Sequence, residues 1–247
     1  ARLLRRKHGF KGYIHLKVIP GASPAAVEEA LALASAVSLN IETPGAANLA
    51  RLSNTKDYLR DIIEPIKLIS RLTARGSRYA KVKQTTQFIV GAAGESDAEI
   101  VRYMGGLYDR LNMHRVYFSA YQKSAGDKSL PTEASGPSDV FMREHRLYQV
   151  DFLMRKYGFK DTDIVFGAAG NLSLDTDPKE VWARNHTEFF PVDVNRASKR
   201  ALLRVPGLGP LTVDRIVQTR RTQRIGRPED VGPVGVRLRK AAPFLAF

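Results

Sequence analysis

NRASKRALLRVPGLGPLTVDRIVQTRR (residues 195–221) contains two short amphipathic segments on either side of Pro206-Gly207-Leu208-Gly209. Apolar residues recur at helical spacing before this break and again after it. The pattern predicts one helix capped by Asn195 and a second helix that begins at Pro210. Because glycine can adopt a positive φ, the two glycines allow a tight turn and a close backbone approach to a ligand. We therefore expect a helical hairpin with a glycine-built turn.

These residues resemble a helix-hairpin-helix DNA-binding motif, and EDVGPVGVRLRKAAPFL (229–245) is similar to the partner helices that complete such a unit. Free N–H groups in the turn and at the start of the second helix carry partial positive charge that suits a phosphate. Such contacts involve the DNA backbone and not the bases, so binding is expected to be largely independent of sequence. The residues assigned to DNA binding are Gly207, Leu208, Gly209, Thr212, Lys199, Arg200, Arg220 and Arg221. A plain helical hairpin with a glycine-rich turn is the alternative.

Positive charge is concentrated at the two ends of the chain. The 247 residues hold 39 Lys and Arg against 25 Asp and Glu, a net charge of +14. Residues 1–11 contribute +5 and residues 196–247 contribute +9, whereas residues 12–195 are neutral. A basic tail on a neutral body favours a polyanionic partner and indicates nucleic acid. The alternative is a charged surface that is merely solvated.

Composition excludes several classes of protein. Hydrophobic residues make up 43% and charged residues 26%, a globular mixture that argues against wholesale disorder. No apolar run approaches the ~20 residues of a membrane-spanning helix, and no secretory signal opens the sequence. The chain has no cysteine, so it offers no disulfide, no thiolate zinc site and no cysteine-bound iron–sulfur cluster. These features fit a cytoplasmic protein without a membrane anchor.

Short β-rich runs alternate with helical stretches between residues 10 and 121, which predicts parallel βαβ units. The four strands are predicted at residues 13–19, 38–43, 85–90 and 116–121. Helices capped by Ser23 and Ser96 follow the first and third strands, and a helical region at 55–75 is predicted to break at Pro65. In two strands the polar face carries ionisable groups, which suggests a lumen lined for a ligand. Edge strands whose polar face meets solvent are the alternative.

Composition also suggests the domain organisation. Residues 122–139 are rich in Ser, Gly and Pro and are predicted to form a loop, whereas residues 143–157 are predicted to be helical, with Gly158 as C-cap. We expect residues 1–150 to form an α/β domain and residues 151–191 to form a connecting segment packed on it. Residues 192–247 then form a small all-α domain.

Five segments, in their order and together with the tail, resemble the radical S-adenosylmethionine (radical SAM) superfamily, specifically its DNA modification or repair members with a C-terminal helix-hairpin-helix. The segments are GFKGYIHLKVIPGAS (9–23), SLNIETPGAANLARLS (38–53), TTQFIVGAAGESDAEIV (85–101), RVYFSAYQK (115–123) and REHRLYQVDFLMRKYGF (143–159). The resemblance implies a partial (β/α) TIM-type barrel that starts at about the third strand of the superfamily's barrel and covers about strands 3–6.

The resemblance also implies a cofactor site. Asn40 and Glu42 would hold the ribose and methionine part of S-adenosylmethionine, Ile89 and Gly91 would flank adenine, and Glu95 ends a matching GxxGE pattern. Physical chemistry agrees for Glu42, because a carboxylate accepts hydrogen bonds from ribose hydroxyls. Further lumen candidates, each of which could equally be structural, are His15, Lys17, Gln87, Tyr117, Ser119 and Tyr121.

The superfamily's defining feature is absent from this sequence. Its three closely spaced cysteines ligate a 4Fe–4S cluster that binds S-adenosylmethionine, and this chain has none. Because the sequence also starts at Ala1 and lacks counterparts of the first two strands, we expect an N-terminally incomplete protein. The intact enzyme would cleave S-adenosylmethionine at the cluster and abstract hydrogen from DNA; the chain alone is expected to be inactive. The family's association also suggests a uracil-glycosylase-like partner protein.

Two other functions are compatible with the sequence. A non-catalytic DNA-binding adaptor would use a degenerate barrel as a scaffold for the hairpin. An unrelated barrel enzyme would bind a phosphate at the glycine-rich turn of residues 91–94.

Overall fold

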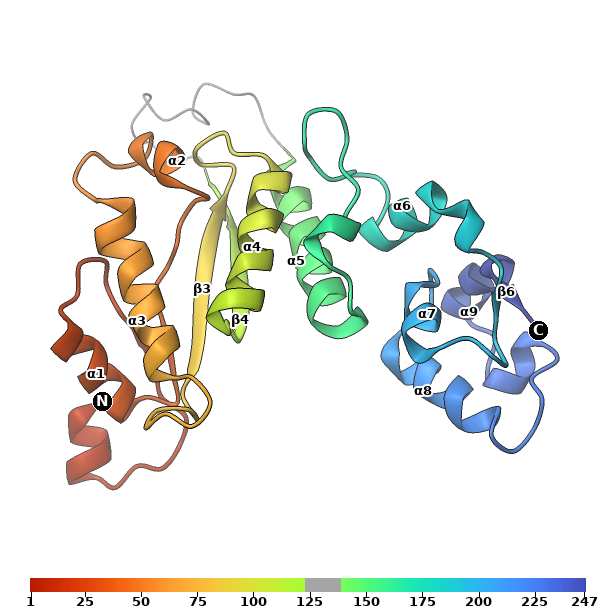
Figure 1. The fold of residues 1–247 in the computed structure, drawn as a ribbon, viewed down its shortest axis with the longest axis horizontal. Coiled ribbons are helices and arrows are strands. Elements are labelled where there is room, and N and C mark those ends of the chain that lie inside the picture. The colour runs from red at the N-terminus through yellow and green to blue at the C-terminus, as the bar shows by residue number, and fades with distance from the viewer. Residues whose placement is uncertain (123–138) are drawn as a thin grey trace. The chain divides into compact units, whose positions relative to one another are not determined.

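The structure, a computed structural model, describes residues 1–122 and 139–247, which form two compact units (Figure 1). Unit 1 comprises residues 1–148 and 168–171, and unit 2 comprises residues 149–167 and 172–247. Most of the segment expected to connect two domains, residues 151–191, therefore groups with the C-terminal residues. The predicted loop at 122–139 lies outside the described residues except at its two ends. Within the described part, no helix has the length and apolar character needed to cross a membrane.

Unit 1 is built on a parallel sheet of four strands in the order β1-β2-β3-β4, which confirms the predicted parallel α/β fold. The strands are β1 (His15–Lys17), β2 (Ala36–Ser38), β3 (Lys83–Val90) and β4 (Arg115–Ala120). The helices are η1 (Leu3–Lys7), α1 (Pro24–Leu33), α2 (Ala46–Ala50), η2 (Tyr58–Ile63), α3 (Glu64–Leu72), α4 (Asp97–Leu111) and the first part of α5 (Val140–Tyr157). The sheet is open in the described residues, so the expected barrel is not confirmed.

Capping residues set the helix boundaries where the sequence predicts them. The Ser23 hydroxyl accepts a hydrogen bond from the N–H of Ala26, and Ser96 forms a reciprocal capping box with Glu99. The helical region at 55–75 divides at the predicted proline: η2 ends at Ile63, and α3 has Pro65 in its first turn. Proline is tolerated there because the first N–H groups of a helix have no intrahelical partner.

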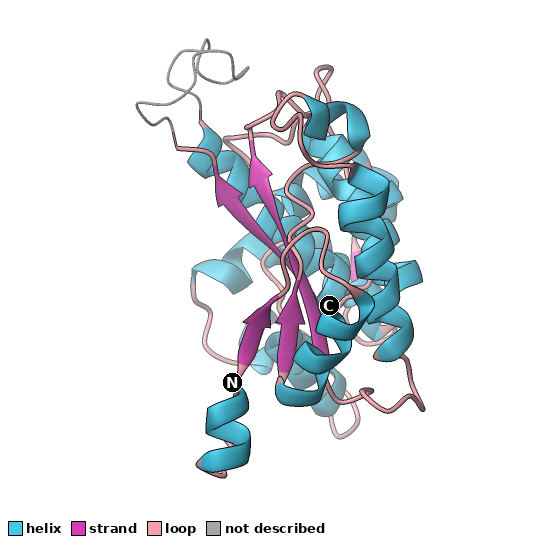
Figure 2. Ribbon diagram, turned by 90° about the vertical axis from the view of Figure 1, so that its left-hand side faces the viewer, coloured by secondary structure: helices cyan, strands magenta, loops and turns pink. Residues whose placement is uncertain are grey.

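The helices of unit 1 pack on one face of the sheet, as expected when strands follow in sequence order with right-handed crossovers. The Gln84 amide donates to the carbonyl of Ile66 in α3 at 2.9 Å, so even-numbered residues of β3 face the helices. Phe88 and Val90 on this face are fully buried. Figure 2 shows the strands side by side with their arrowheads pointing the same way, as in a parallel sheet. The odd-numbered residues of β3 consequently point to the opposite face, where the predicted polar side chains lie.

The start of α5 protects the free edge of β4. The Tyr148 hydroxyl lies within hydrogen-bond distance of both the N–H and the carbonyl of Phe118, at 3.1 and 2.9 Å. The Glu144 carboxylate accepts the N–H of Ala120 at 2.7 Å. Because exposed strand edges invite pairing with other chains, these side chains close the sheet on this side.

Unit 2 is mostly helical, which confirms the predicted C-terminal helical region. Its elements are the end of α5, η3 (Asp161–Asp163), α6 (Pro178–Asn185), η4 (Thr187–Phe189), β5 (Val192–Asp193), α7 (Lys199–Arg204), α8 (Pro210–Thr219), η5 (Pro228–Val231), α9 (Val236–Ala241), η6 (Ala242–Phe244) and β6 (Leu245–Ala246). The core is made of buried aliphatic residues that include Leu202, Leu208, Val213, Ile216 and Ile225. A short parallel ladder between β5 and β6 joins the two ends of residues 192–246.

The predicted cap of the first hairpin helix is wrong. Helix α7 is capped by Ser198, whose hydroxyl accepts the N–H of Ala201 at 3.1 Å. Asn195 instead exchanges two hydrogen bonds of 2.9 Å with the backbone of Ile225. A side chain that both donates and accepts in this way ties the start of the hairpin to the loop that follows α8.

Candidate functional site

A cavity of about 410 Å³ lies at the C-terminal ends of the four strands. Ligands of parallel α/β folds bind at this end of the sheet. The lining residues are Lys17, Asn40, Glu42, Gln87, Ile89, Ser119, Ala120, Tyr121 and Gln122. The structure thus brings together Asn40, Glu42 and Ile89 from the predicted cofactor site with several of the lumen candidates. His15 and Tyr117 lie outside the lining.

Glu42 has an unusual backbone conformation at this cavity. Its φ is +64°, a left-handed value that costs about 1–2 kcal/mol for residues other than glycine. Two hydrogen bonds to β3 hold it: its N–H donates to Gln87 at 3.0 Å, and its carbonyl accepts from Ile89 at 2.7 Å. Strain of this kind persists where the surroundings enforce it, often at binding sites. The backbone of β3 therefore fixes a carboxylate at the cavity wall.

Gly91 and Glu95, which the resemblance also assigns to the cofactor, do not line this cavity. Glu95 is only 3% exposed, and its carboxylate accepts the N–H groups of Gly91 and of Ala93, the latter at 3.0 Å. Burial raises the pKa of Glu95, and these hydrogen bonds oppose that rise. Because the Glu95 carboxylate already accepts two N–H groups of this turn, the structure argues against the alternative of a phosphate site at residues 91–94.

The hairpin between α7 and α8 forms where the sequence predicts it, but its first glycine serves packing. Gly207 has a φ of +85°, and a Cβ added to it would lie 2.2 Å from the carbonyl oxygen of Arg237. Leu208 is 2% exposed and belongs to the core, so its side chain is unable to reach DNA. Gly209 caps α8 without a side-chain hydrogen bond and leaves the first N–H groups of α8 to other partners.

A second hairpin, which the sequence analysis treated only as partner helices, follows the first. Val231-Gly232-Pro233-Val234-Gly235-Val236 repeats the form of Val205-Pro206-Gly207-Leu208-Gly209-Pro210. Each stretch contains a glycine of positive φ, and in each the last glycine caps a helix, α8 or α9. The repeated Val-x-x-Leu/Val-Gly pattern was the signal available in the sequence.

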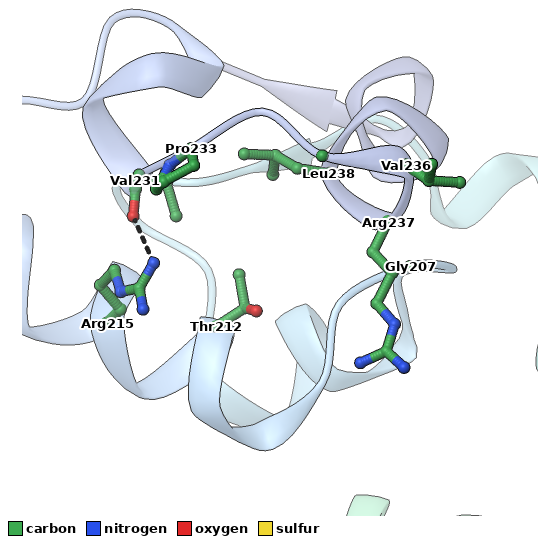
Figure 3. A pocket seen from close by; sticks show the side chains of 10 residues that line it. Gly207, Thr212, Arg215, Val231, Pro233, Val236, Arg237 and Leu238 are labelled. Carbon is green, nitrogen blue, oxygen red and sulfur yellow. Dashed lines mark hydrogen bonds between the residues drawn. The ribbon is translucent and has the colours of Figure 1, made fainter.

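A cavity of about 240 Å³ lies between the two hairpins. Figure 3 shows Thr212 at the start of α8 beside this cavity, with Arg215 on one side and Arg237 on the other. Arg215 donates to the carbonyl of Val231 at 3.4 Å, which links α8 to the second hairpin. Thr212, which the sequence assigns to DNA binding, lines this cavity together with Arg215 and Arg237, which the sequence prediction did not include.

Three of the four predicted DNA-binding cations hold unit 2 together. Lys199 pairs with Asp214, and Arg200 donates to the carbonyl of Gly158 at 3.1 Å. Arg220 donates to the carbonyls of Val194 and Ala197 at 3.2 and 2.6 Å. Arg221 is exposed and has no ion pair with any residue in the described ranges. The sequence shows where positive charge is abundant, but these contacts depend on residues far along the chain.

A buried lysine supports the first hairpin. Lys179 of α6 is 7% exposed, its Nζ donates to the carbonyl of Leu208 at 2.6 Å, and it lies 4.5 Å from the centre of the Tyr157 ring. Burial lowers the pKa of Lys179 to about 7; Asp177 opposes this shift and Lys240 adds to it. An ordinary lysine has a pKa of about 10.4.

The free energy of unfolding of unit 2 should therefore rise with pH between about 7 and 10. In this window the unfolded chain binds a proton at Lys179 that the folded chain does not, and the slope is at most about 1.4 kcal/mol per pH unit. Below this window both states are protonated, and the cost of burying the charge is complete. Urea unfolding followed by Trp182 fluorescence at several pH values measures the slope. Lys179→Met should lose this contribution, and an unchanged slope in that variant would contradict it.

Known proteins give no further guide to these sites. No protein-family model matches the chain. Comparisons with curated proteins and with solved structures also find no match.

The residues present do not fit an iron–sulfur cluster. The chain has no cysteine, and the described residues contain no group of three or more His, Asp or Glu that could hold a metal ion. The adenosyl part of S-adenosylmethionine is a different case, because the cavity of unit 1 offers a carboxylate, three amides and two apolar side chains.

Proposed function

We propose that this chain binds the sugar–phosphate backbone of nucleic acid through the two hairpins of residues 192–247. The observation that carries the proposal is the repeated hairpin, with Arg215 and Arg237 beside the cavity between the two turns. The net charge of +9 over residues 196–247 supports it, because a polyanion is attracted to this unit as a whole.

The chemistry of such binding is sequence-independent. The first N–H groups of α8 have no intrahelical partner, and Gly209 contributes no capping side chain. They present partial positive charge to a phosphate, and arginine guanidinium groups add charge-assisted hydrogen bonds. None of these donors reads a base edge, so duplexes of different sequence should bind with similar affinity.

Affinity for duplex DNA should fall steeply with salt concentration. Each phosphate neutralised contributes about −0.9 to the slope of log K against log salt, since counterions are released. Arg215→Gln and Arg237→Gln should each reduce the slope by about 1, as measured by fluorescence anisotropy with labelled duplexes. Arg102→Gln, the same change at an exposed position of α4 in unit 1, is the matched control. A slope near zero, or a slope that neither hairpin variant changes, would overturn the proposal.

A second function is favoured by the cavity of unit 1. We propose that it binds the adenosyl group of S-adenosylmethionine, with the Glu42 carboxylate accepting the ribose hydroxyls, Asn40 and Gln87 offering amide groups and Ile89 contacting adenine. The strained backbone that fixes Glu42 at the cavity supports this assignment. Together with the hairpins, it supports a DNA-modifying or DNA-repair enzyme of the radical SAM kind.

This chain supplies no cysteine ligands for an iron–sulfur cluster. What these residues supply is binding of the nucleoside part. Equilibrium binding of S-adenosylmethionine to the 247-residue chain tests the assignment. If hairpin-dependent DNA binding is present and S-adenosylmethionine binding is absent, the chain is the non-catalytic adaptor.

A further inference from the structure

The sheet of unit 1 has one face that none of the described helices of this unit covers. Parallel sheets are usually covered on both faces, so a polar open face calls for a partner or ligand. The side chains on it differ from one end of the strands to the other. By register, its N-terminal half carries the basic residues His15, Lys17, Lys83 and Arg115, and its acidic residue, Glu42, lies at the C-terminal end.

Four side chains form one row across this basic half. The strand register places Lys17 beside Ser38, Ser38 beside Thr85, and Thr85 beside Arg115. Adjacent strands are about 4.8 Å apart, so the two basic residues stand about 14 Å apart with two hydroxyl groups between them.

Two polar atoms in this row are buried without a partner. Thr85 is 4% exposed, and neither its Oγ1 nor the Nε of Arg115 has a hydrogen bond. The neighbouring Thr86, on the helix-covered face, is fully satisfied: its Oγ1 donates to Leu39 at 2.8 Å and accepts from Ile41 at 2.9 Å. An unsatisfied buried polar group costs about 1–3 kcal/mol, so a ligand atom that paired with the Thr85 hydroxyl would remove this cost.

The two positive charges of the row are also not neutralised by neighbouring acidic side chains in the part of unit 1 that the structure describes. Neither Lys17 nor Arg115 forms an ion pair with an acidic residue in the described part of unit 1. The Arg115 guanidinium is instead held 4.8 Å from the ring centre of Tyr117, which is 36% exposed on the same face. An exposed aromatic ring beside two cations is suited to stacking a base near its phosphate.

We propose that the row of Lys17, Ser38, Thr85 and Arg115 binds a phosphate ester. The phosphoryl oxygens would accept hydrogen bonds from the two hydroxyls and from Arg115, and Lys17 would add a second positive charge. Lys17 also lines the adenosyl cavity, so the row continues directly from it. The inference deepens the proposed function, since the phosphate belongs to a nucleotide or to a nucleic-acid strand. The row itself does not depend on the hairpins.

NMR titration of the full chain with inorganic phosphate, thymidine, thymidine 5′-monophosphate and a short oligothymidylate tests this assignment. Carrying it out in the Arg215→Gln, Arg237→Gln background weakens hairpin binding, and the amide signals of the row report on binding at the row itself. Backbone amide signals of Ser38, Thr85 and Arg115 should shift with phosphate and with the monophosphate, and not with thymidine. Tighter binding of the oligothymidylate identifies a strand as the source of the phosphate, whereas equal binding identifies a free nucleotide.

Variants of the row supply the controls. Arg115→Gln should weaken the monophosphate about tenfold, because a charged hydrogen bond is lost. Thr85→Val keeps the side-chain shape, so it should weaken binding while the unfolding temperature is unchanged or raised. Arg102→Gln should leave binding unchanged. Absence of saturable shifts in the row with every probe, or shifts that Arg115→Gln does not alter, would overturn the inference. If only the proposal of DNA binding by the hairpins failed, the chemical-shift changes of the row would still be observed.

Discussion

Gly207→Ala should destabilise unit 2 by about 3–4 kcal/mol, combining the strain of a left-handed backbone with that of an overpacked contact. The glycine has a φ of +85°. Its missing Cβ would lie 2.2 Å from the carbonyl oxygen of Arg237 and 3.1 Å from the backbone nitrogen of Ala241. Both neighbours are backbone atoms of α9, so neither can move aside as a side chain would. The first hairpin and α9 must separate to admit the methyl group.

The single tryptophan makes this effect measurable. Trp182 is 4% exposed in unit 2, so denaturant unfolding followed by its fluorescence reports on this unit. Gly209→Ala is the matched control, because its φ is −109° and the added Cβ would meet only the Tyr157 hydroxyl at 3.5 Å. It should retain nearly normal stability. If Gly207→Ala unfolded at the same denaturant concentration as the original chain, the packing role of this glycine would be refuted.

Elements of the fold with a local signal were predictable from the sequence. Alternating polar and apolar residues located β1, β3 and β4, whereas the second strand was predicted at 38–43 and is found at Ala36–Ser38. Ser23, Ser96 and Pro65 marked helix boundaries through capping and the missing N–H of proline. Asn40 and Glu42 line one cavity as expected, but they follow β2 and do not belong to it, and the positive φ of Glu42 departs from strand geometry. Each of these inferences needs only residues close together in the chain.

The remaining features depend on contacts between distant residues. From the sequence alone, Gly207 is predicted to let the backbone approach a phosphate. In the structure α9, thirty residues later in the chain, packs against it. Arg220 appears free until its carbonyl partners near residue 195 are known. Glu95 was predicted at the cofactor, but in the structure it holds the turn that begins at Gly91. A sequence pattern gives the chemistry that is present, and tertiary packing decides which part of it stays available to a ligand.

Glu42→Gly should make unit 1 more stable and should weaken binding of S-adenosylmethionine at the cavity that Glu42 lines. Glycine removes the cost of the left-handed backbone at φ +64°, and its own greater freedom in the unfolded chain offsets part of that gain. The net increase in the free energy of unfolding should be about 0.5–1 kcal/mol. Loss of the carboxylate removes charged hydrogen bonds to the ribose, so affinity for S-adenosylmethionine should fall about 10- to 100-fold.

Asn112→Gly separates strain that serves binding from strain that does not. Asn112 has a φ of +49° at the C-terminal end of α4, away from the lining of the cavity. Its replacement should change the stability of the chain less, because asparagine tolerates the left-handed conformation, and should leave S-adenosylmethionine affinity unchanged. Calorimetric unfolding and equilibrium binding of both variants measure the two effects. If Glu42→Gly destabilised the chain, the strained conformation would be structural. If the variant bound S-adenosylmethionine as tightly as the original chain, the carboxylate would have no part in the site.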